Sequence, residues 1–407
     1  MIKWITNELG TAKKNETDED IYNIIDVRDM VDKRGNSDQL ILAKINAVIK
    51  LLKNKKRIVV CCDYGISRSN AIAVGVLVKY YGYDFEDAIK QVIKKTGEET
   101  IQLGILNSVK NALGVNYENK KKKNRKMILI TGADNFIGKA LVRVLKNRYD
   151  LIIPKKSELD LTKGPIYLDS MVKKYGANLI VHLDNPKIGT TTKSMGETII
   201  MLKNVLDVCQ ENKIPLIFPS SWKIFAGYKN RLITVLSSLF PYPTDTYGQT
   251  RLLCETILDQ YKKNYGVKVA ILRFSTIYGL GGDEPKFIRD FIEKAKKNLV
   301  IYNHKYKNGF PVLDLLNIED AVRAIELIIK KNFYGTISIG SGVGYSTFEI
   351  ARKIRKLCCS NSKIIFREIK DFGPKFVMDI KETKKVLGWS PKITLEDGLK
   401  EIIKFSL

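Results

Sequence analysis

Residues 127–145 constrain the fold more than any other stretch of this 407-residue chain. Four apolar residues predict a short buried strand, a turn follows at Gly132, and apolar residues then recur at helical spacing as far as Leu145. Such a strand-turn-helix lets the backbone approach a pyrophosphate closely. Gly132 suits the tight turn, Gly138 lets the helix pack on the sheet, and the N–H groups at the helix start favour phosphate oxygens. The sequence therefore predicts an α/β fold with a dinucleotide site at this turn.

The turn, Thr131-Gly-Ala-Asp-Asn-Phe-Ile-Gly138, resembles the TGxxGFIG turn of extended short-chain dehydrogenase/reductases, especially nucleotide-sugar epimerases, dehydratases and reductases. The resemblance spans residues 127 to about 405 and implies a Rossmann doubly wound parallel sheet with a small substrate-binding subdomain. Asn135 stands at the family's second glycine. Asn tolerates left-handed backbone better than most residues, but its side chain narrows the approach to a pyrophosphate. The cofactor-binding residues implied here are Gly132, Asn135, Phe136, Ile137 and Gly138.

A second predicted strand at residues 151–154 bears on the choice of dinucleotide. Lys155 and Lys156 follow it, where a carboxylate binds the ribose 2′-OH in NAD-preferring folds and basic residues accommodate a 2′-phosphate. The sequence therefore favours NADP, with NAD as the alternative. The next residues resemble the family's S/K-E-L-D-L-T stretch, which implies that Asp160 and Leu161 flank the adenine.

The resemblance also implies a catalytic set: a tyrosine near the nicotinamide, a hydroxyl for the reacting sugar oxygen, and a cation that favours the phenolate. Residues 219–225 resemble S-S-x-x-V-Y, which gives Ser221 the hydroxyl role. Residues 245–255 resemble Y-G-x-S-K-x-x-x-E, so Tyr247 is the acid/base and Arg251 occupies the cation's position, one helical turn away. Lysine in this family also binds the nicotinamide ribose and relays protons, whereas arginine is bulkier and permanently charged. Slowed chemistry, or a domain that only binds, is the alternative.

Four further segments resemble family patterns. They are residues 179–183 (V-x-H-L-A-A, followed here by Asp184), 270–279 (L-R-x-x-N-I-Y-G), 314–321 (D-F-I-H-V-x-D-A, preceded by Leu313) and 379–391 (D-x-S-K-x-x-x-L-G-W-x-P). Asp184 replaces a small residue, and Leu313 stands where many members carry an arginine that binds the substrate diphosphate. The last pattern is a signature of nucleotide-sugar enzymes.

Residues 57–70 form the centre of the N-terminal part. A predicted buried strand ends at Cys62, a loop follows, and an apolar helix runs from Ala71 to Tyr81. Five residues separate Cys62 from Arg68, so the loop can wrap a phosphate with its N–H groups while the guanidinium binds two of the oxygens. The helix N-terminus lowers the thiol pKa, and the thiolate can then attack phosphorus.

This C-x5-R segment, with Gly65 and a Ser-Arg-Ser ending, resembles the dual-specificity branch of the cysteine phosphatases over roughly residues 3–113. The resemblance implies that Cys62 forms a phosphocysteine, that Arg68 holds the phosphoryl group, and that Ser69 assists release. A cysteine-phosphatase α/β domain is therefore expected at this end of the chain. The other interpretation is a phosphate-binding pseudoenzyme, or a structural cysteine on a buried strand.

A phosphatase also needs a general acid to protonate the leaving oxygen. The family takes it from an aspartate loop before the cysteine, and residues 27–36 supply Asp29 and Asp32. Asp32 is favoured because Asp-x-x-Gly-Asn resembles the family's acid loop and a predicted helix follows directly. Asp29 is the alternative.

Residues 117–126 are polar and charged without apolar spacing, and they lie between an apolar helix pattern and the strand at Met127. They predict a basic linker between a dual-specificity-phosphatase-like domain at 1–116 and an extended short-chain dehydrogenase/reductase domain at 127–407. Extended members of that family often pair through two helices, so a homodimer is expected on resemblance alone.

The net charge of +25 is compatible with nucleic acid, an anionic membrane or phosphate-rich substrates. The lysines are scattered through nearly every segment, and no interleaving of aromatic and basic residues marks a stacking platform. A lysine-rich coding bias is therefore favoured, and a nucleic-acid partner is not expected. Phosphate-bearing substrates fit either interpretation.

Two absences bear on location: no apolar run reaches membrane-spanning length, and the first residues lack the apolar segment of a signal peptide. No spacing of residues typical of metal ligands stands out either. The six cysteines include two adjacent pairs, Cys61-Cys62 and Cys358-Cys359, a pattern that suggests reduced thiols. We expect a cytoplasmic protein without a metal site or membrane insertion.

Two hypotheses of function follow. The first is a bifunctional enzyme, in which an NAD(P)-dependent nucleotide-sugar epimerase, dehydratase or reductase is joined to a cysteine phosphatase. Its substrates would be a nucleotide sugar and a phosphomonoester. The second is a phosphatase regulated by a catalytically weak domain that senses a dinucleotide or a sugar nucleotide.

Overall fold

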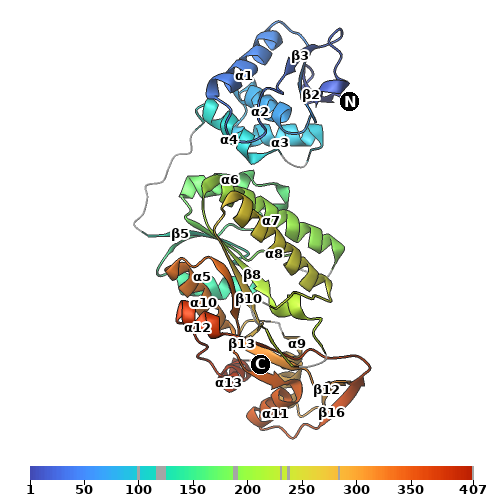
Figure 1. Cartoon of the computed structure of the whole chain (residues 1–407), viewed down its shortest axis with the longest axis vertical. Coiled ribbons are helices and arrows are strands. Elements are labelled where there is room, and N and C mark those ends of the chain that lie inside the picture. The colour runs from blue at the N-terminus through green and yellow to red at the C-terminus, as the bar shows by residue number, and fades with distance from the viewer. Residues whose placement is uncertain are drawn as a thin grey trace. The chain divides into compact units, whose positions relative to one another are not determined.

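A computed structural model describes residues 1–98, 101–115, 125–186, 191–229, 232–235, 239–282 and 285–405 (Figure 1). The chain forms two compact units: Met1–Lys122 with Ser157–Gly176, and Lys123–Lys156 with Ala177–Leu407. Residues 117–124 of the predicted linker lie outside the described residues. The predicted domain limits, 1–116 and 127–407, remain predictions.

The first unit contains a four-stranded sheet in the order β1-β2-β4-β3, in which β1 is antiparallel to β2 and the other neighbours are parallel. All five residues of the inner strand β4 are buried, because an inner strand covered on both faces must be apolar throughout. The strands are β1 (Lys3–Trp4), β2 (Leu9–Lys13), β3 (Asn23–Asp26) and β4 (Ile58–Cys62).

The described residues of this unit contain five α-helices, and several of their ends have ordinary capping residues. Ser37 caps α1 through its side chain, and Gly82, which has a left-handed φ of 74°, caps the C-terminal end of α2. The helices are α1 (Asp38–Lys53), α2 (Arg68–Tyr81), α3 (Phe85–Thr96), α4 (Leu103–Ala112) and α6 (Ile166–Tyr175), with 3₁₀ turns η1 (Lys14–Glu16) and η2 (Leu161–Lys163).

The second unit is built on a six-stranded parallel sheet in the order β14-β10-β8-β7-β5-β6. The strands are β5 (Met127–Thr131), β6 (Asp150–Ile152), β7 (Leu179–His182), β8 (Leu216–Ser221), β10 (Val269–Phe274) and β14 (Gly335–Ile339). The first strand, β5, has β6 on one side and β7 on the other, so the strand order reverses there. In open α/β sheets, ligands bind beyond the carboxyl ends of the strands at such a reversal. The predicted Rossmann-like doubly wound parallel sheet is confirmed.

Helices cover both faces of this sheet (Figure 1). The pair α7 and α8 packs on one face, and α5, α10 and α12 lie together on the other. The helices are α5 (Phe136–Leu145), α7 (Thr192–Asn212), α8 (Thr246–Tyr265), α10 (Ile318–Lys331) and α12 (Lys381–Leu387).

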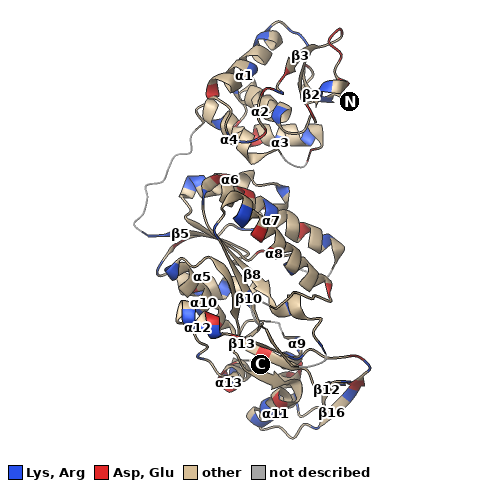
Figure 2. Ribbon diagram, viewed as in Figure 1, with Lys and Arg blue, Asp and Glu red and all other residues tan. Residues whose placement is uncertain are grey.

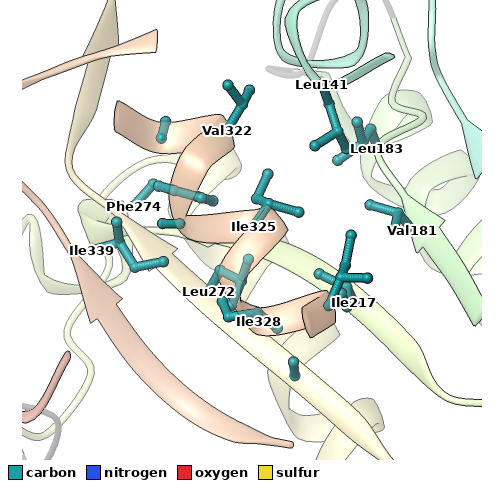
Figure 3. Close-up of a cluster of buried hydrophobic side chains, with 14 of the residues drawn as sticks. Leu141, Val181, Leu183, Ile217, Leu272, Phe274, Val322, Ile325, Ile328 and Ile339 are labelled. Atoms are coloured by element: carbon teal, nitrogen blue, oxygen red, sulfur yellow. The ribbon is translucent and has the colours of Figure 1, made fainter. Parts of the chain in front are cut away.

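The core between the sheet and α10 explains the apolar strand patterns. Figure 3 shows Val322, Ile325 and Ile328 of α10 against strand residues such as Val181 and Leu272. Each fully buried aliphatic side chain contributes about 1.5–3 kcal/mol to folding.

A smaller subdomain is formed by elements that come after β8 in the chain, and it has its own apolar cluster, which includes Phe291, Ile350 and Leu399. Its elements are η3 (Trp222–Phe225), β9 (Ile233–Val235), β11 (Thr276–Tyr278), α9 (Lys286–Lys296), β12 (Ile301–Tyr306), β13 (Val312–Asn317), β15 (Gly344–Ser346), α11 (Thr347–Leu357), β16 (Ile364–Ile369), β17 (Phe376–Met378) and α13 (Leu395–Phe405).

The segment 387–393, which contains the end of the tail signature at 379–391, folds back onto α10. The Trp389 side chain is fully buried, and its Nε1 donates to the Asp320 carbonyl oxygen at 3.2 Å. The buried Asp320 carboxylate accepts from the backbone N–H groups of Lys392 at 2.8 Å and Ile393 at 2.9 Å. These contacts fasten the C-terminal segment to the sheet's helical layer.

Basic and acidic residues are distributed over nearly every element (Figure 2). No helix among the described residues is long and apolar enough to cross a membrane. Within the same residues, no group of three or more His, Cys, Asp or Glu side chains could hold a metal ion.

Candidate functional site

The glycine turn between β5 and α5 leaves no room for side chains. Gly132 has a φ of +67°, and a Cβ there would lie 2.6 Å from the Asp184 nitrogen. A Cβ at Gly138 would lie 2.3 Å from the Gly132 oxygen. The backbone of the turn is therefore held tightly against the end of β7 and against the first turn of α5.

Asn135 caps α5 and does not adopt the left-handed backbone that its position in the motif suggested. Its φ of −78° and ψ of 174° are those of extended backbone. The side-chain Oδ1 accepts from Gly138 N at 2.8 Å, and Nδ2 donates to the Leu183 oxygen at 2.8 Å. Both polar atoms are thus bound to protein backbone, so the amide that was expected to narrow the approach is anchored against the end of β7.

The start of α5 fits a dinucleotide pyrophosphate. Phe136 and Ile137 supply its first two N–H groups, which helices leave without intrahelical acceptors and which bind phosphate oxygens well. The Phe136 ring packs against Gly282, where a Cβ would lie 2.7 Å from the ring's Cζ. The predicted phosphate-binding residues are therefore brought together at one turn.

The residues predicted to bind the adenosine part are divided between the two units. Lys155 is exposed and belongs to the same unit as the glycine turn. Asp160 and Leu161 belong to Ser157–Gly176, which is part of the other unit. There Asp160 Oδ1 accepts from Thr162 N at 3.0 Å and from Thr162 Oγ1 at 2.6 Å, and Leu161 is buried.

Ser221 and Tyr247 lie at two helix starts that pack together. Ser221 ends β8 and caps η3, where its Oγ accepts from Lys223 N at 3.3 Å. Asp245 caps α8, and its carboxylate also lies 2.9 Å from Lys223 Nζ. A Cβ at Gly248 would lie 2.6 Å from the Lys223 oxygen, so the first turn of α8, which carries Tyr247, packs closely on η3.

Arg251 is buried beside Tyr247. Its Cζ lies 4.9 Å from the centre of the Tyr247 ring and 5.4 Å from that of Phe218. NH2 donates to Asn185 Oδ1 at 2.5 Å, and NH1 donates to the Pro219 oxygen at 3.4 Å. Its Nε has no hydrogen-bond partner within the described parts of the chain. The predicted cation is therefore next to the predicted acid/base.

His182 is a buried neighbour of Arg251. Its Nδ1 lies 2.7 Å from Thr131 Oγ1, whereas its buried Nε2 has no partner in the residues that the structure describes. Burial, and then the charge of Arg251, lower the pKa of His182 to about 3. His182 therefore stays neutral at physiological pH, and it adds no charge beside Arg251.

Two residues of this site were not singled out from the sequence. Asn185 is the hydrogen-bond partner of Arg251, but it is 66 residues away and only tertiary structure joins them. Glu255, quoted only as part of a motif, accepts from Ser220 Oγ at 2.5 Å and from Arg273 NH2 at 2.7 Å. Ser220 and Glu255 are buried, and the Arg273 side chain is mostly buried, so this network joins β8, α8 and β10 beneath the site.

In the first unit, the Cys62 thiol lies in a cradle formed by the loop between β4 and α2. Gly65 N donates to Sγ at 3.2 Å, and Ser69 Oγ lies 3.4 Å from Sγ. Burial would raise the pKa of Cys62, but the hydrogen bonds from Ser69 and from the loop backbone outweigh burial and lower it. Gly65 has a φ of +69°, and a Cβ there would lie 2.7 Å from the Ala12 carbonyl carbon. The loop is thus held against the end of β2.

The neighbouring Cys61 has the opposite environment. Successive residues of a strand point to opposite faces of the sheet, and Cys61 pairs across the sheet with Asp26. Burial and the Asp26 charge raise the pKa of Cys61 to about 11. Only one of the two adjacent thiols is therefore disposed to ionise.

Arg68 connects the cradle to the acid loop. Its NH1 donates to the Met30 oxygen at 3.0 Å and to the Arg28 oxygen at 3.2 Å, and its NH2 forms an ion pair with Asp63. Burial would lower the pKa of Arg68, but Asp63, the Cys62 thiolate and Asp32 raise it. The negative charge of Asp32 thus acts on the guanidinium.

The two candidate acids lie in different surroundings. Asp29 Oδ2 lies 2.8 Å from Lys44 Nζ, with which it forms an ion pair. Asp32 is exposed, in a loop that the Asn36 side chain closes by bonding to Val31 N and Val31 O, each at 2.8 Å. The asparagine of the Asp-x-x-Gly-Asn pattern therefore closes the loop that carries Asp32.

Comparison with known proteins covers mainly the second unit. Residues 128–340, just over half of the chain, match the model of the NAD dependent epimerase/dehydratase family. The UDP-glucuronate 4-epimerase of Thermodesulfobacterium geofontis is 25% identical over 324 residues, which cover 68% of this chain and 95% of that protein. The GDP-6-deoxy-D-talose 4-dehydrogenase of Aggregatibacter actinomycetemcomitans is 26% identical over 280 residues, 64% of this chain and 91% of that protein.

Solved structures show the same fold. The Thermus thermophilus UDP-glucose 4-epimerase in complex with NAD has a TM-score of 0.60 and 18% identity, covering 68% of this chain and 98% of that chain. RMD from Pseudomonas aeruginosa, complexed with NADPH, has a TM-score of 0.61 and 16% identity, covering 69% of this chain and 98% of that chain. No support for a phosphatase domain comes from these relatives. With its parallel sheet, its glycine turn and the match over residues 128–340, the chain belongs to the NAD dependent epimerase/dehydratase family.

Proposed function

We propose that the chain is a bifunctional enzyme, whose second unit converts a nucleotide sugar by epimerisation, dehydration or reduction with a nicotinamide dinucleotide. The observation that carries the first activity is the buried Arg251 guanidinium over the Tyr247 ring, at the start of the helix that packs on η3. The nucleotide-sugar substrate class is drawn from relatives such as the UDP-glucuronate 4-epimerase.

Each residue of the site has its own role in the proposed reaction of the nucleotide sugar. The N–H groups of Phe136 and Ile137 hold the pyrophosphate, and the dinucleotide, when bound, supplies or accepts a hydride. Tyr247 takes or gives the proton of the sugar hydroxyl, and Ser221 Oγ hydrogen-bonds that hydroxyl. Arg251 places a positive charge 4.9 Å from the centre of the Tyr247 ring, beside the atoms that exchange the proton.

NADP is the proposed partner, with NAD as the alternative, because Lys155 and Lys156 follow β6 where a 2′-phosphate is accommodated. Titrating NADPH and NADH into the full chain by fluorescence tests this proposal. Tighter binding of NADPH, weakened by Lys155→Ala with NADH affinity unchanged, would support it. Tighter binding of NADH would favour NAD, and equal affinities would mean that the two lysines do not select the dinucleotide.

The catalytic proposal is tested by incubating the full chain with UDP-glucose or UDP-glucuronate and both dinucleotides, and separating the products. We expect turnover that falls by about 10²- to 10⁴-fold in Tyr247→Phe, because general acid/base catalysis contributes that much. Saturable dinucleotide binding without turnover of any nucleotide sugar would instead favour the regulatory alternative, in which this unit is a sensor.

A second activity is proposed for the first unit: hydrolysis of a phosphomonoester through a Cys62 thiolate. The lowered pKa of Cys62 within a loop that ends at Arg68 carries this proposal. Cys62 would attack phosphorus as the ester oxygen leaves with a proton from Asp32, and water would then release phosphate with help from Ser69. The alternative is a phosphate-binding pseudoenzyme.

Hydrolysis of p-nitrophenyl phosphate tests the phosphatase. We expect Cys62→Ser to abolish turnover and the matched Cys61→Ser to retain most of it. Asp32→Asn should lower kcat by about 10²-fold or more, and Asp29→Asn should not. Equal hydrolysis by Cys62→Ser and the wild type would rule out this mechanism.

A further inference from the structure

Arg251 is held in place by its partners. The residue is 4% exposed, and a buried charge is costly unless its donors are satisfied. Asn185 Oδ1 and the Pro219 oxygen accept from the two terminal nitrogens, and the Tyr247 and Phe218 rings lie within 4.9 Å and 5.4 Å of Cζ. The guanidinium is therefore held by two hydrogen bonds and two ring contacts, which a compact ammonium could not make in full.

Asn185 is oriented for this contact. It follows β7 closely, and its Nδ2 donates to the Leu183 oxygen at 3.2 Å, which directs Oδ1 to Arg251 at 2.5 Å. The resembling family pattern V-x-H-L-A-A has a small residue here, which would offer no acceptor. Asn at 185 and Arg at 251 thus depart from the pattern together, and the two departures touch each other.

We propose that Asn185 is a positioning residue that holds the Arg251 guanidinium over the Tyr247 ring, so that asparagine and arginine act as a matched pair. The inference rests on the proposed role of Tyr247 as acid/base. Its consequence is that Arg251→Lys lowers turnover, although it restores the residue of the family motif. Lysine would leave Asn185 Oδ1 without its donor and would lose the two-ring contact.

The test is a double-mutant cycle in the full chain with Asn185→Ala, Arg251→Lys and the double variant, and Asn185→Asp as the conservative rescue. Turnover of UDP-glucose or UDP-glucuronate is measured beside NADH affinity and thermal unfolding. We expect each single variant to lose about 10-fold in kcat with KM within about 2-fold, since small misplacements near a reacting group cost up to about 10²-fold. The double variant should be no slower than the worse single one.

The rescue separates positioning from packing. Asn185→Asp keeps an oxygen acceptor for Arg251 but loses the donation to the Leu183 oxygen, so its kcat should lie between that of Asn185→Ala and that of the wild type. Losses that multiply in the double variant, an unchanged kcat in Asn185→Ala, or a gain in Arg251→Lys would each overturn the inference.

Thermal unfolding decides the inference even if these sugars are not turned over. The pair is supported if the loss of Tm in the double variant is smaller than the sum of the two single losses by about 2–4 °C. Losses of Tm that add up overturn it. Failure of the proposed function would appear differently, as a wild type that neither binds NADH or NADPH nor converts a nucleotide sugar.

Discussion

Two adjacent residues, Cys61 and Cys62, show how a strand and a loop can give one side-chain type opposite reactivity. Hydrogen bonds lower the pKa of Cys62, so its thiolate persists to lower pH than an ordinary thiolate. Burial and Asp26 raise the pKa of Cys61 to about 11. The sequence alone pointed to Cys62 through the spacing to Arg68, and the structure supplies the physical difference.

We therefore expect iodoacetate to alkylate Cys62 with a midpoint below that of an ordinary thiol, and Cys61 with a midpoint near pH 11. Peptide mapping by mass spectrometry after timed reaction at each pH separates the two sites from the other cysteines. Ser69→Ala removes a hydrogen bond to Cys62 Sγ and should move the Cys62 midpoint upward. A common midpoint for both thiols would contradict this.

Asp63 is a second residue with a testable effect. Its carboxylate forms an ion pair with Arg68, the guanidinium proposed to hold the phosphoryl group, and therefore competes with a phosphate dianion. Its side chain is 48% exposed, and exposed ion pairs contribute about 0–1 kcal/mol. Asp63→Asn should lower KM for p-nitrophenyl phosphate by up to about 5-fold. Asp87→Asn, whose partner is Lys90, gives the same change in net charge and should leave KM unchanged.

At the scale of elements, the tail signature acts through packing. The buried Asp320 carboxylate accepts two backbone N–H groups of the tail, and Trp389 is fully buried against the same helix. Asp320→Ala leaves those donors unpaired, so we expect a loss of about 1–3 kcal/mol in the free energy of unfolding. Chemical denaturation measures it, with exposed Glu382→Gln as a control expected within about 0.5 kcal/mol. Equal effects of both variants would mean that the tail is not fastened there.

Elements with local signals were predictable. The apolar run, the glycine turn and the helical spacing of residues 127–145 predicted what the structure has as β5 and α5. The backbone conformation of Asn135 was not predictable, because a motif position says which residue usually stands there and not which φ this chain adopts. The partners of Arg251 were not predictable either, because Asn185 and Phe218 reach it only through the packing of β7, β8 and α8.

At the scale of the whole molecule, two compact units each contain a sheet. Residues 1–116 include a complete four-stranded sheet with α1 to α4, and residues 127–407 include all six strands of the parallel sheet. A sheet with its own helices and core can fold independently. The segment Ser157–Gly176 is the complication, because it lies between β6 and β7 in the sequence but belongs to the first unit.

We predict that fragments 1–116 and 127–407 each fold alone and keep their own activity. Each should unfold cooperatively on heating, and 127–407 should bind dinucleotide within about 2-fold of the full chain, because its proposed phosphate-binding turn is wholly its own. Circular dichroism and NADPH or NADH titration of both fragments and the full chain make the comparison. The prediction is contradicted if the fragment 127–407 unfolds more than about 5 °C below the corresponding transition of the full chain. For a domain of this size, such a shift corresponds to a loss of more than about 1 kcal/mol. It would mean that Ser157–Gly176 needs the first unit and that the stabilities of the two units are coupled.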